Sequence, residues 1–296
     1  MKILLTNHAL NLLGGSELWI YTIGSELVKR GHKVDVFTNV LGDISVLVNR
    51  IKPWANVITS KPRDEYDLVI ANHTTTTDAI MHLTCPKIRN CHSVFIEQEF
   101  FEPGFDYYVS VSEWVQRVQK VRGFNSIVIN NPIDCKRFFP KNEISDNPKK
   151  AFIFAQPFEA GFKLMASACE AQGLEIIERT GYVWDIENLI NSADIVLSID
   201  RVMLEAMACG RNVINVDQRW WQKEVFGSGI ITPDNFNKLK MDYFRGEQYV
   251  QVFNKYTLFK EIGKYKKEYG QELRSRVLLE YSVEEIVDQY LQLIER

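Results

Sequence analysis

The chain has 296 residues, 46% of them hydrophobic and 25% charged, with a formal net charge of −3 at pH 7. This length allows two domains of ordinary size, and the slightly acidic balance argues against a protein built mainly to bind nucleic acid or an anionic membrane. No apolar run approaches the roughly 18 residues that span a bilayer, so we expect at most peripheral membrane contact. The five cysteines include no C-x-x-C, which favours a cytoplasmic protein.

The N-terminal segment predicts a βαβ opening. An apolar strand at 2–7 precedes a helix with Ser16 as its N-cap, and a second strand follows at 33–38. Gly14 and Gly15 stand before the helix, where bare backbone can approach a phosphate or can simply serve the turn. The rest of this half is expected to contain strands at 67–71, 88–92 and 107–111, a solvated threonine loop at 74–77 and a helix at 112–122.

A polar, proline-flanked stretch at 140–150 is the best candidate for a linker. A second α/β pattern follows it, with strands predicted at 151–155 and 174–178. The sequence therefore predicts two α/β domains joined near this stretch.

Residues 191–217 are expected to form a compact strand–loop–helix–strand unit. The apolar run at 195–199 suits a strand buried on both faces, and 203–209 is a helix of strong formers that ends at Gly210. Ligands bind beyond the carboxyl ends of such strands, and the helix N–H groups favour phosphate. Glu205, in the predicted first turn of the helix, either reaches this crevice or merely complements the helix dipole.

Several stretches resemble a known family. LEAMACGRNVI is similar to the LEAMACGxPVI stretch of the retaining glycosyltransferases of family 4, which have the GT-B fold. GGSELWIYTIGSELVKRGHKVDVFT resembles the GGxE…LxxRGHxVxVxT opening of that family, and GSGIITPDNF resembles the G-x-V-T-P-E-N-F stretch of its compact members. The resemblance covers nearly the whole chain. It implies two Rossmann-like α/β domains that face a cleft.

The resemblance also implies domain roles. We expect an N-terminal acceptor-side domain at 1–142, a C-terminal nucleotide-sugar-binding domain at 143–280, and a C-terminal helix at 281–296 that returns to the first domain.

It further implies roles for individual residues. Glu205 would hold the ribose hydroxyls of the donor, Gly14 and Gly15 would line the cleft near the donor diphosphate or the acceptor, and His92 would contact the donor sugar. The alternative for His92 is a purely structural histidine.

The chain departs from the family at the donor loop. The second glutamate of the common pattern is replaced by Leu197, and the loop resembles a compact G-R-x-x-LEA version in which Asp200 stands for the glycine. Asp200 is then the only acid left in this loop and the remaining candidate for a catalytic carboxylate.

The cations that usually neutralise the donor diphosphate are also missing. The family's G-R-x-x-x-x-K-G loop is replaced by AQPFEAGFK, so either Lys163 or Arg201 is expected to substitute. Arg201, Val202 and Met203 stand at the mouth of the predicted helix and complete the expected donor site. No D-x-D or metal-ligand cluster occurs, so we expect neither metal nor cofactor, with a nucleotide-diphosphate sugar as co-substrate.

The leading hypothesis is a retaining, metal-independent glycosyltransferase that acts on a carbohydrate, lipid-linked sugar or small-molecule acceptor. One alternative is a glycosyltransferase that modifies hydroxylated bases in nucleic acid, which basic clusters such as 149–150 support only thinly. A second is a non-catalytic nucleotide-sugar-binding protein, suggested by the missing donor-site residues. An NAD-dependent enzyme is disfavoured because no G-x-G-x-x-G follows the first strand.

Overall fold

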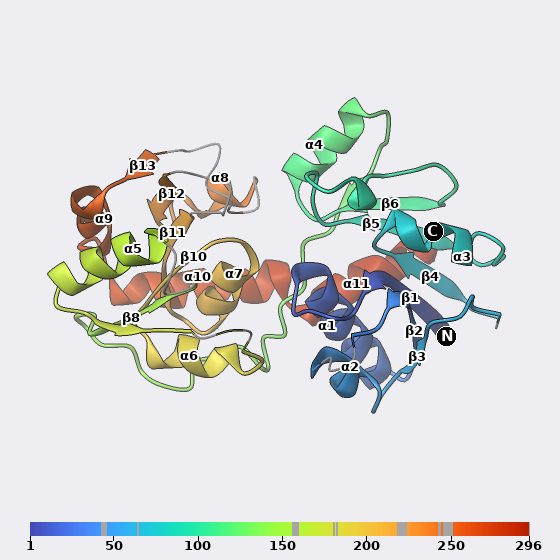
Figure 1. The fold of residues 1–296 in the computed structure, drawn as a ribbon, viewed down its shortest axis with the longest axis horizontal. Helices are drawn as coiled ribbons and strands as arrows, with labels where there is room; N and C mark the ends of the chain where they lie inside the picture. The colour runs from blue at the N-terminus through green and yellow to red at the C-terminus, as the bar shows by residue number, and fades with distance from the viewer. Residues whose placement is uncertain are drawn as a thin grey trace. The chain divides into compact units, whose positions relative to one another are not determined.

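The computed structural model describes residues 1–42, 46–63, 65–155, 160–179, 181, 183–217, 224–241, 244 and 251–295 (Figure 1). The chain divides into two compact units. Unit 1 is Met1–Pro132 together with Val283–Arg296, and unit 2 is Ile133–Ser282. The domain bounds expected from the sequence, at 142–143 and 280–281, differ somewhat from this division and stay a prediction.

Unit 1 is built on a parallel sheet, which has seven strands in the described part of the chain, in the order β3-β2-β1-β4-β5-β6-β7. The strand order reverses between β1 and β4. The strands are β1 (Lys2–Ala9), β2 (Lys33–Val40), β3 (Asn56–Ile58), β4 (Leu68–Ala71), β5 (Lys87–Cys91), β6 (Tyr107–Ser110) and β7 (Ile127–Val128). The helices are α1 (Gly15–Lys29), α2 (Val46–Ile51), η1 (Thr74–Thr76), α3 (Thr77–Ile80), η2 (Glu97–Glu99), α4 (Glu113–Val121) and α11 (Val283–Ile294).

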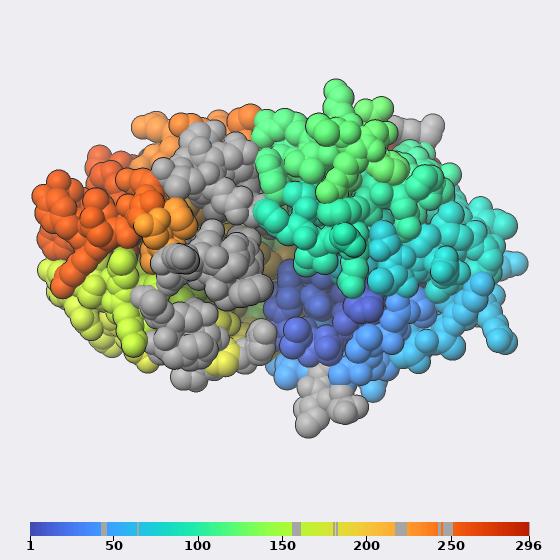
Figure 2. Space-filling model, turned by 45° about the horizontal axis from the view of Figure 1, so that its top comes forward, coloured from blue at the N-terminus to red at the C-terminus, as the bar shows by residue number. Residues whose placement is uncertain are grey.

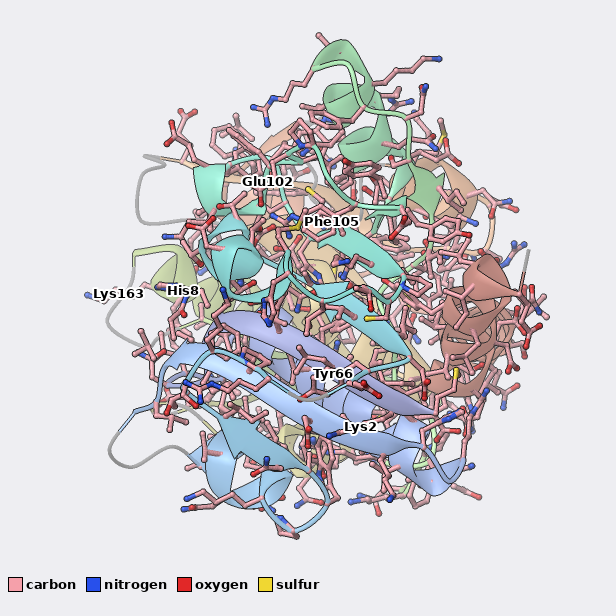
Figure 3. The ribbon with its side chains drawn as sticks, turned by 90° about the vertical axis from the view of Figure 1, so that its right-hand side faces the viewer. Lys2, His8, Tyr66, Glu102, Phe105 and Lys163 are labelled. Carbon is pink, nitrogen blue, oxygen red and sulfur yellow. The ribbon has the colours of Figure 1, made fainter. Side chains whose placement is uncertain are left out.

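The sheet of unit 1 is covered on both faces, which explains why its central strands are continuous apolar runs rather than alternating ones. All four residues of β4 are buried. On one face of the sheet the core includes Tyr66 and Phe105, and the Lys2 ammonium lies 4.8 Å from the centre of the Tyr66 ring (Figure 3). The helix α4 forms part of the surface seen in Figure 2, where it is green, and its last residue Val121 is 89% exposed.

The last helix belongs to unit 1 because its contacts lie on α1. Arg30, at the end of α1, forms an ion pair with Asp288 and donates to the carbonyl of Glu284 at 2.7 Å. The rings of Trp19 and Tyr290 meet edge to face, with centroids 5.7 Å apart, and both side chains are buried. Each such aromatic contributes roughly 1.5–3 kcal/mol by burial, so this packing fixes the helix more firmly than the exposed ion pair does.

Unit 2 is built on a mixed sheet in the order β13-β12-β11-β10-β8-β9, counted over its described residues. The strands β9, β8, β10 and β11 are parallel, β12 and β13 are antiparallel, and the order reverses between β8 and β10. The strands are β8 (Lys150–Ile153), β9 (Glu175–Ile177), β10 (Ile195–Ser198), β11 (Asn212–Asp217), β12 (Val225–Ile230) and β13 (Gln251–Phe253). The helices are α5 (Ala160–Ala171), α6 (Ile186–Ser192), α7 (Asp200–Ala208), α8 (Phe236–Lys240), α9 (Lys255–Ile262) and α10 (Lys267–Tyr281).

The helix α7 begins at Asp200 rather than at Met203, so Glu205 lies beyond the first turn in which the sequence placed it. The helix ends at Gly210, whose φ of +70° is the left-handed conformation that glycine adopts at helix ends. A Cβ on Gly270 of α10 would overlap the carbonyl of Gly210, so two glycines let α10 approach the end of α7 closely. Arg274 of α10 donates to the carbonyl of Ala208, which satisfies an end of the helix that otherwise lacks partners.

Two further expectations at loops are corrected. The N-cap of α1 is Gly14 rather than Ser16, because the Ser16 hydroxyl donates instead to the Glu17 carboxylate at 3.0 Å. The threonine tract is not a solvated loop, since Thr76 is fully buried and its hydroxyl lies 2.8 Å from that of Thr6.

The stretch expected to be a linker is held inside unit 2. The Asp194 carboxylate, just before β10, accepts the backbone N–H groups of Ser145, Lys149 and Lys150 at 2.8–3.1 Å. A polar sequence can therefore be ordered without an apolar face when one buried acid satisfies several of its backbone donors.

Candidate functional site

Each unit has one place where its sheet favours ligand binding. In open parallel sheets, ligands bind beyond the carboxyl ends of the strands where the strand order reverses. This point lies between β8 and β10 in unit 2 and between β1 and β4 in unit 1. Most of the site residues expected from the sequence lie near one of these two points.

In unit 2 the structure brings Arg201 and Glu205 together. They occupy positions i and i+4 of α7, which a helix places on one face, and the Arg201 Nε donates to Glu205 Oε1 at 2.8 Å. Glu205 is 3% exposed. Burial raises the pKa of Glu205, and the charge and hydrogen bond of Arg201 oppose that rise. The glutamate is thus a buried, cation-paired carboxyl at the carboxyl end of β10.

A second ion pair lies near the first and was missed from the sequence. The Arg137 Nη2 is 2.9 Å from Glu187 Oε2, and its guanidinium carbon is 4.6 Å from the centre of the Trp184 ring. The charges of Arg137 and Glu187 both act on the pKa of Glu205. Arg137 stands in the stretch NPIDCKRFFP, which was not singled out from the sequence. A second cation near Glu205 therefore comes from this stretch, whereas Lys163 or Arg201 was expected from the sequence.

The ends of the neighbouring strands add polar and aromatic groups. Ser198, the last residue of β10, is 2% exposed, and its hydroxyl forms no hydrogen bond within the described residues. Just after β9, the guanidinium of Arg179 stacks 4.3 Å from the centre of the Phe154 ring, which follows β8. A cation, an aromatic ring and a hydroxyl suit a ligand with a flat base and hydroxyl groups.

The other residues expected in the donor site have different surroundings. Asp200 has φ of +52°, the left-handed region that favours the glycine found there in the compact pattern. Val202 and Met203 are buried, so any contact they make with a donor uses their backbone. Lys163 is exposed in the first turn of α5 (Figure 3). The preceding loop at 156–159 lies outside the described residues.

In unit 1, His92 follows β5 and has both ring nitrogens engaged. Nε2 accepts from the Asn90 side-chain amide at 3.0 Å, so the ring proton is on Nδ1, which lies 3.3 Å from Asn131 Oδ1. The ring packs edge to face on Trp19 at 5.6 Å. Burial lowers the pKa of His92 to about 4, so the imidazole is neutral near pH 7. Its expected contact with the donor sugar stays a prediction.

A row of buried asparagines connects the strand ends of unit 1. Asn72 donates to Asn7 and Asn90 donates to Asn72, both at 3.2 Å, while the Tyr290 hydroxyl of α11 donates to Asn90 at 3.0 Å. All three asparagines are fully buried. They were missed, although an asparagine recurs close to a histidine in TNH, ANH and RNCH. The row holds the ends of β1, β4 and β5 in register.

The glycine pair before α1 serves the Glu17 carboxylate. A Cβ on Gly14 would overlap Glu17 Oε2, whereas a Cβ on Gly15 would meet no described atom within 4 Å. Burial raises the pKa of Glu17, and the nearby charge of Glu99 acts in the same direction. Gly14 therefore makes room for a half-buried acid, whereas Gly15 has no such neighbour.

Other features of the described residues do not point to a ligand site. None of them form a cluster of histidine, cysteine or acidic side chains that could hold a metal ion. No described helix combines the length and apolar character that a membrane crossing requires. A polar hollow of about 410 Å³ is lined by residues such as Asp146, Lys149 and Lys267, but it lies at the amino ends of β8 and β10, away from the switch point.

Both units are Rossmann-like, and the solved structures that match the chain have the GT-B fold, so the expected fold class is confirmed. No protein-family model and no curated protein matches the sequence.

Solved structures with this fold match along the whole chain. A glycosyltransferase from Rickettsia africae ESF-5 is 13% identical, with a TM-score of 0.60 over 99% of this chain and 97% of that one. AviGT4, a glycosyltransferase of avilamycin A biosynthesis, is 15% identical, with a TM-score of 0.55 over 99% and 96%. An alpha-glucosyltransferase bound to UDP and a DNA with an HMU base is 14% identical, with a TM-score of 0.55 over 100% of both. At these identities the likeness shows the fold alone.

Proposed function

We propose that the protein is a glycosyltransferase that moves a sugar from a nucleotide-diphosphate donor to an acceptor hydroxyl, with retention of configuration and without a metal ion, in the manner of family 4. One observation carries this proposal. The buried pair of Arg201 and Glu205 lies at the carboxyl end of β10, beside the switch point of the unit 2 sheet. A buried acid with a perturbed pKa and a specific charged partner at a switch point is a candidate for a functional group.

In this proposal the residues of unit 2 hold the nucleotide. The Glu205 carboxylate accepts hydrogen bonds from the two ribose hydroxyls, while Arg201 orients it from the preceding turn. The N–H groups at the start of α7 and the guanidinium of Arg201 stabilise the charge that develops on the departing diphosphate. The Arg179 guanidinium stacked on Phe154 offers a surface for the base.

The proposed chemical step needs no protein nucleophile. The bond from the anomeric carbon to the diphosphate oxygen breaks, the bond to the acceptor oxygen forms on the same face, and the acceptor proton passes to the departing phosphate. Leu197 supports a mechanism without a protein nucleophile, because this apolar residue stands where the family's second glutamate would be and is 1% exposed. Asp200 is the acid that remains nearby for a double displacement.

The acceptor is a carbohydrate, a lipid-linked sugar or a small molecule in the leading form of the proposal. Transfer to hydroxylated bases in nucleic acid is a second candidate, favoured by the likeness to an alpha-glucosyltransferase bound to DNA. The net charge of −3 works against it, since phosphate-backbone binding relies on cations.

The test is a panel of UDP-, GDP-, ADP- and CDP-sugars, measured by thermal shift and by release of the nucleoside diphosphate. A ligand at a hundred times its Kd stabilises the fold by about 2.7 kcal/mol, which a melting curve resolves. The product anomer, read by NMR, then decides retention. If a nucleotide sugar binds but no acceptor gives turnover, the result supports a non-catalytic binding protein. If no nucleotide sugar of the panel raises the melting temperature, the result contradicts the proposal.

The role of Arg201 has its own test. Arg201→Ala should weaken nucleoside diphosphate binding by several-fold to a hundredfold, and more than it weakens nucleoside binding, because the diphosphate loses a charged hydrogen bond of about 1.5–3 kcal/mol while the nucleoside loses only the orientation of Glu205. Equal losses for nucleoside and nucleoside diphosphate would make Arg201 a structural residue.

A further inference from the structure

We propose that Glu99 and His73, at the switch point of unit 1, bind the hydroxyl group of the acceptor, and that this acceptor is uncharged and rich in hydroxyls, such as a neutral sugar or polyol. The inference rests on the proposed function and adds to it the chemical class of the second substrate.

The first observation is a buried carboxylate oxygen without a partner. Glu99, the last residue of η2, is 6% exposed, and its Oε1 lies 3.8 Å from Nε2 of His73. Its Oε2 is buried and forms no hydrogen bond within the described part of the chain. Buried polar atoms nearly always have a partner, and an unmatched one marks a place where a ligand or water completes the bonding.

The second observation is that Arg89 fixes the backbone on both sides of this glutamate. The fully buried Arg89 guanidinium donates to the carbonyls of Gln98 and Phe100 at 3.0 and 3.1 Å, and also to those of Ala71 and Asn90. A whole arginine is thus buried on β5 to hold the turn that carries Glu99. Such rigid support is typical of a group that must meet a ligand in one direction.

The third observation is the tautomer of His73, which is 7% exposed. Its Nδ1 accepts the backbone N–H of His8 at 3.0 Å, so the proton of the neutral ring is on Nε2, on the side of Glu99 (Figure 3 labels His8). The pair therefore presents one donor, the imidazole N–H, and one acceptor, the carboxylate Oε2. A hydroxyl group, which both donates and accepts, matches this pair.

The balance of charges around the pair disfavours an anionic acceptor. The Glu17 carboxyl lies close enough for the charges of Glu99 and His73 to act on it, and Glu102 acts with Glu99 on Arg89. The Arg89 guanidinium is the cation among these groups, and its Nη1 and Nη2 groups are bonded to four carbonyls. A phosphate or carboxylate brought between two acids would be repelled in a buried, weakly screened site, whereas a hydroxyl would not.

His92 is a poorer candidate for the same task. Both of its ring nitrogens already bond to side chains of unit 1, and so a substrate would have to displace one of them. Glu99 has a carboxylate oxygen without a hydrogen bond among the described residues, whereas both ring nitrogens of His92 are already bonded.

The experiment uses the full-length protein with the donor identified by the panel, and measures release of the nucleoside diphosphate with matched acceptors. Glucose is compared with glucuronate and glucose 6-phosphate, and inositol with inositol phosphate. The wild-type protein should prefer the neutral member of each pair. Glu99→Gln should lower kcat/KM for the neutral acceptors by roughly ten- to a hundredfold and reduce the ratio of kcat/KM between the neutral and the anionic member of each pair. The affinity for the nucleoside diphosphate should not change.

Glu97→Gln is the matched control, because Glu97 belongs to the same turn but is exposed. It removes one negative charge at nearly the same place and should leave turnover as it was. If Glu99→Gln misfolds, as loss of nucleoside diphosphate binding would show, Glu99→Asp replaces it: turnover should fall while the preference for neutral acceptors persists.

Three outcomes would overturn the inference while the proposed function survives. In the first, Glu99→Gln and Glu97→Gln have the same kcat/KM for neutral acceptors. In the second, the protein hydrolyses the donor but no neutral sugar or polyol accelerates release of the nucleoside diphosphate. In the third, the protein transfers sugar to DNA with hydroxymethyluracil but not to free sugars. Failure of every nucleotide sugar to bind would instead count against the proposed function itself.

Discussion

The substitution Glu205→Gln separates a ribose-binding carboxylate from a structural one. Glutamine keeps the size and the helix propensity of the side chain but removes its charge. Two interactions change: the hydrogen bond that Glu205 receives from Arg201 at 2.8 Å, and the proposed bonds from the donor ribose. The first affects stability, and the second affects donor affinity.

The magnitudes follow from burial. Breaking a buried ion pair costs about 3–5 kcal/mol when the remaining charge is fully enclosed, and less here because the Arg201 side chain is 12% exposed. Glu26 and Arg30 on α1 form a matched pair, also at i and i+4, with the nitrogen 3.1 Å from the carboxylate and the Glu26 side chain 6% exposed. Glu26→Gln should therefore also lower stability without touching unit 2, but by less, because Arg30 keeps its ion pair with Asp288.

Donor affinity is the deciding measurement. Loss of charge-assisted bonds to the ribose should weaken nucleoside diphosphate binding by about 1.5–3 kcal/mol, roughly ten- to over a hundredfold. Isothermal titration well below both melting temperatures, with urea denaturation for stability, separates the two effects. If both variants lose stability and both bind the nucleotide as the wild type does, Glu205 is a structural acid and the donor site lies elsewhere.

Three further predictions concern pH, backbone strain and metal. The pKa of His92, about 4, is below its unfolded value of about 6.5, so the unfolded chain binds more protons between these values and stability should fall by up to about 3 kcal/mol as the pH drops through this window. His92→Gln should flatten the plot of unfolding free energy, measured by urea denaturation, against pH. Parallel plots for the variant and the wild type would contradict the assignment. Asp200→Ala should melt below Asp200→Gly, because a left-handed residue other than glycine costs about 1–2 kcal/mol, and equal melting temperatures would show that this φ is not strained. Turnover should survive EDTA, since helix N–H groups and arginines are expected to hold the diphosphate, and activity lost on chelation and restored by magnesium would reveal ligands that the sequence did not indicate.

The sequence predicted the central strands of both sheets because those signals are local. The apolar run before α7 and Gly210 after it define a strand–helix unit in any context. The ion pair of Arg201 with Glu205 was not predicted, because the helix was expected to begin only at Met203. The helix start was placed too late, because Asp200 occupies a backbone conformation that its residue type disfavours.

What the sequence missed depends on contacts between distant segments. Arg137 reaches the candidate site of unit 2 through Glu187 of α6, fifty positions along the chain. Arg89 looked like an ordinary strand residue, and only the fold shows that its guanidinium reaches the turn at Glu99. Propensity and periodicity describe neighbours in sequence, so partners of this kind remain invisible until the sheet is assembled.

The chain enters and leaves unit 2 at one place. The backbone N–H of Ile133 donates to the carbonyl of Tyr281 at 2.7 Å, and Ile133 forms an isolated bridge with Ser282. Unit 2 is therefore an insertion with adjoining ends rather than the second half of a tandem. Residues 133–282 therefore form a segment that can be exchanged for the corresponding segment of a solved protein with the GT-B fold. Under the proposed function, such chimaeras would combine a new donor preference with the original acceptor preference, through two junctions that lie side by side.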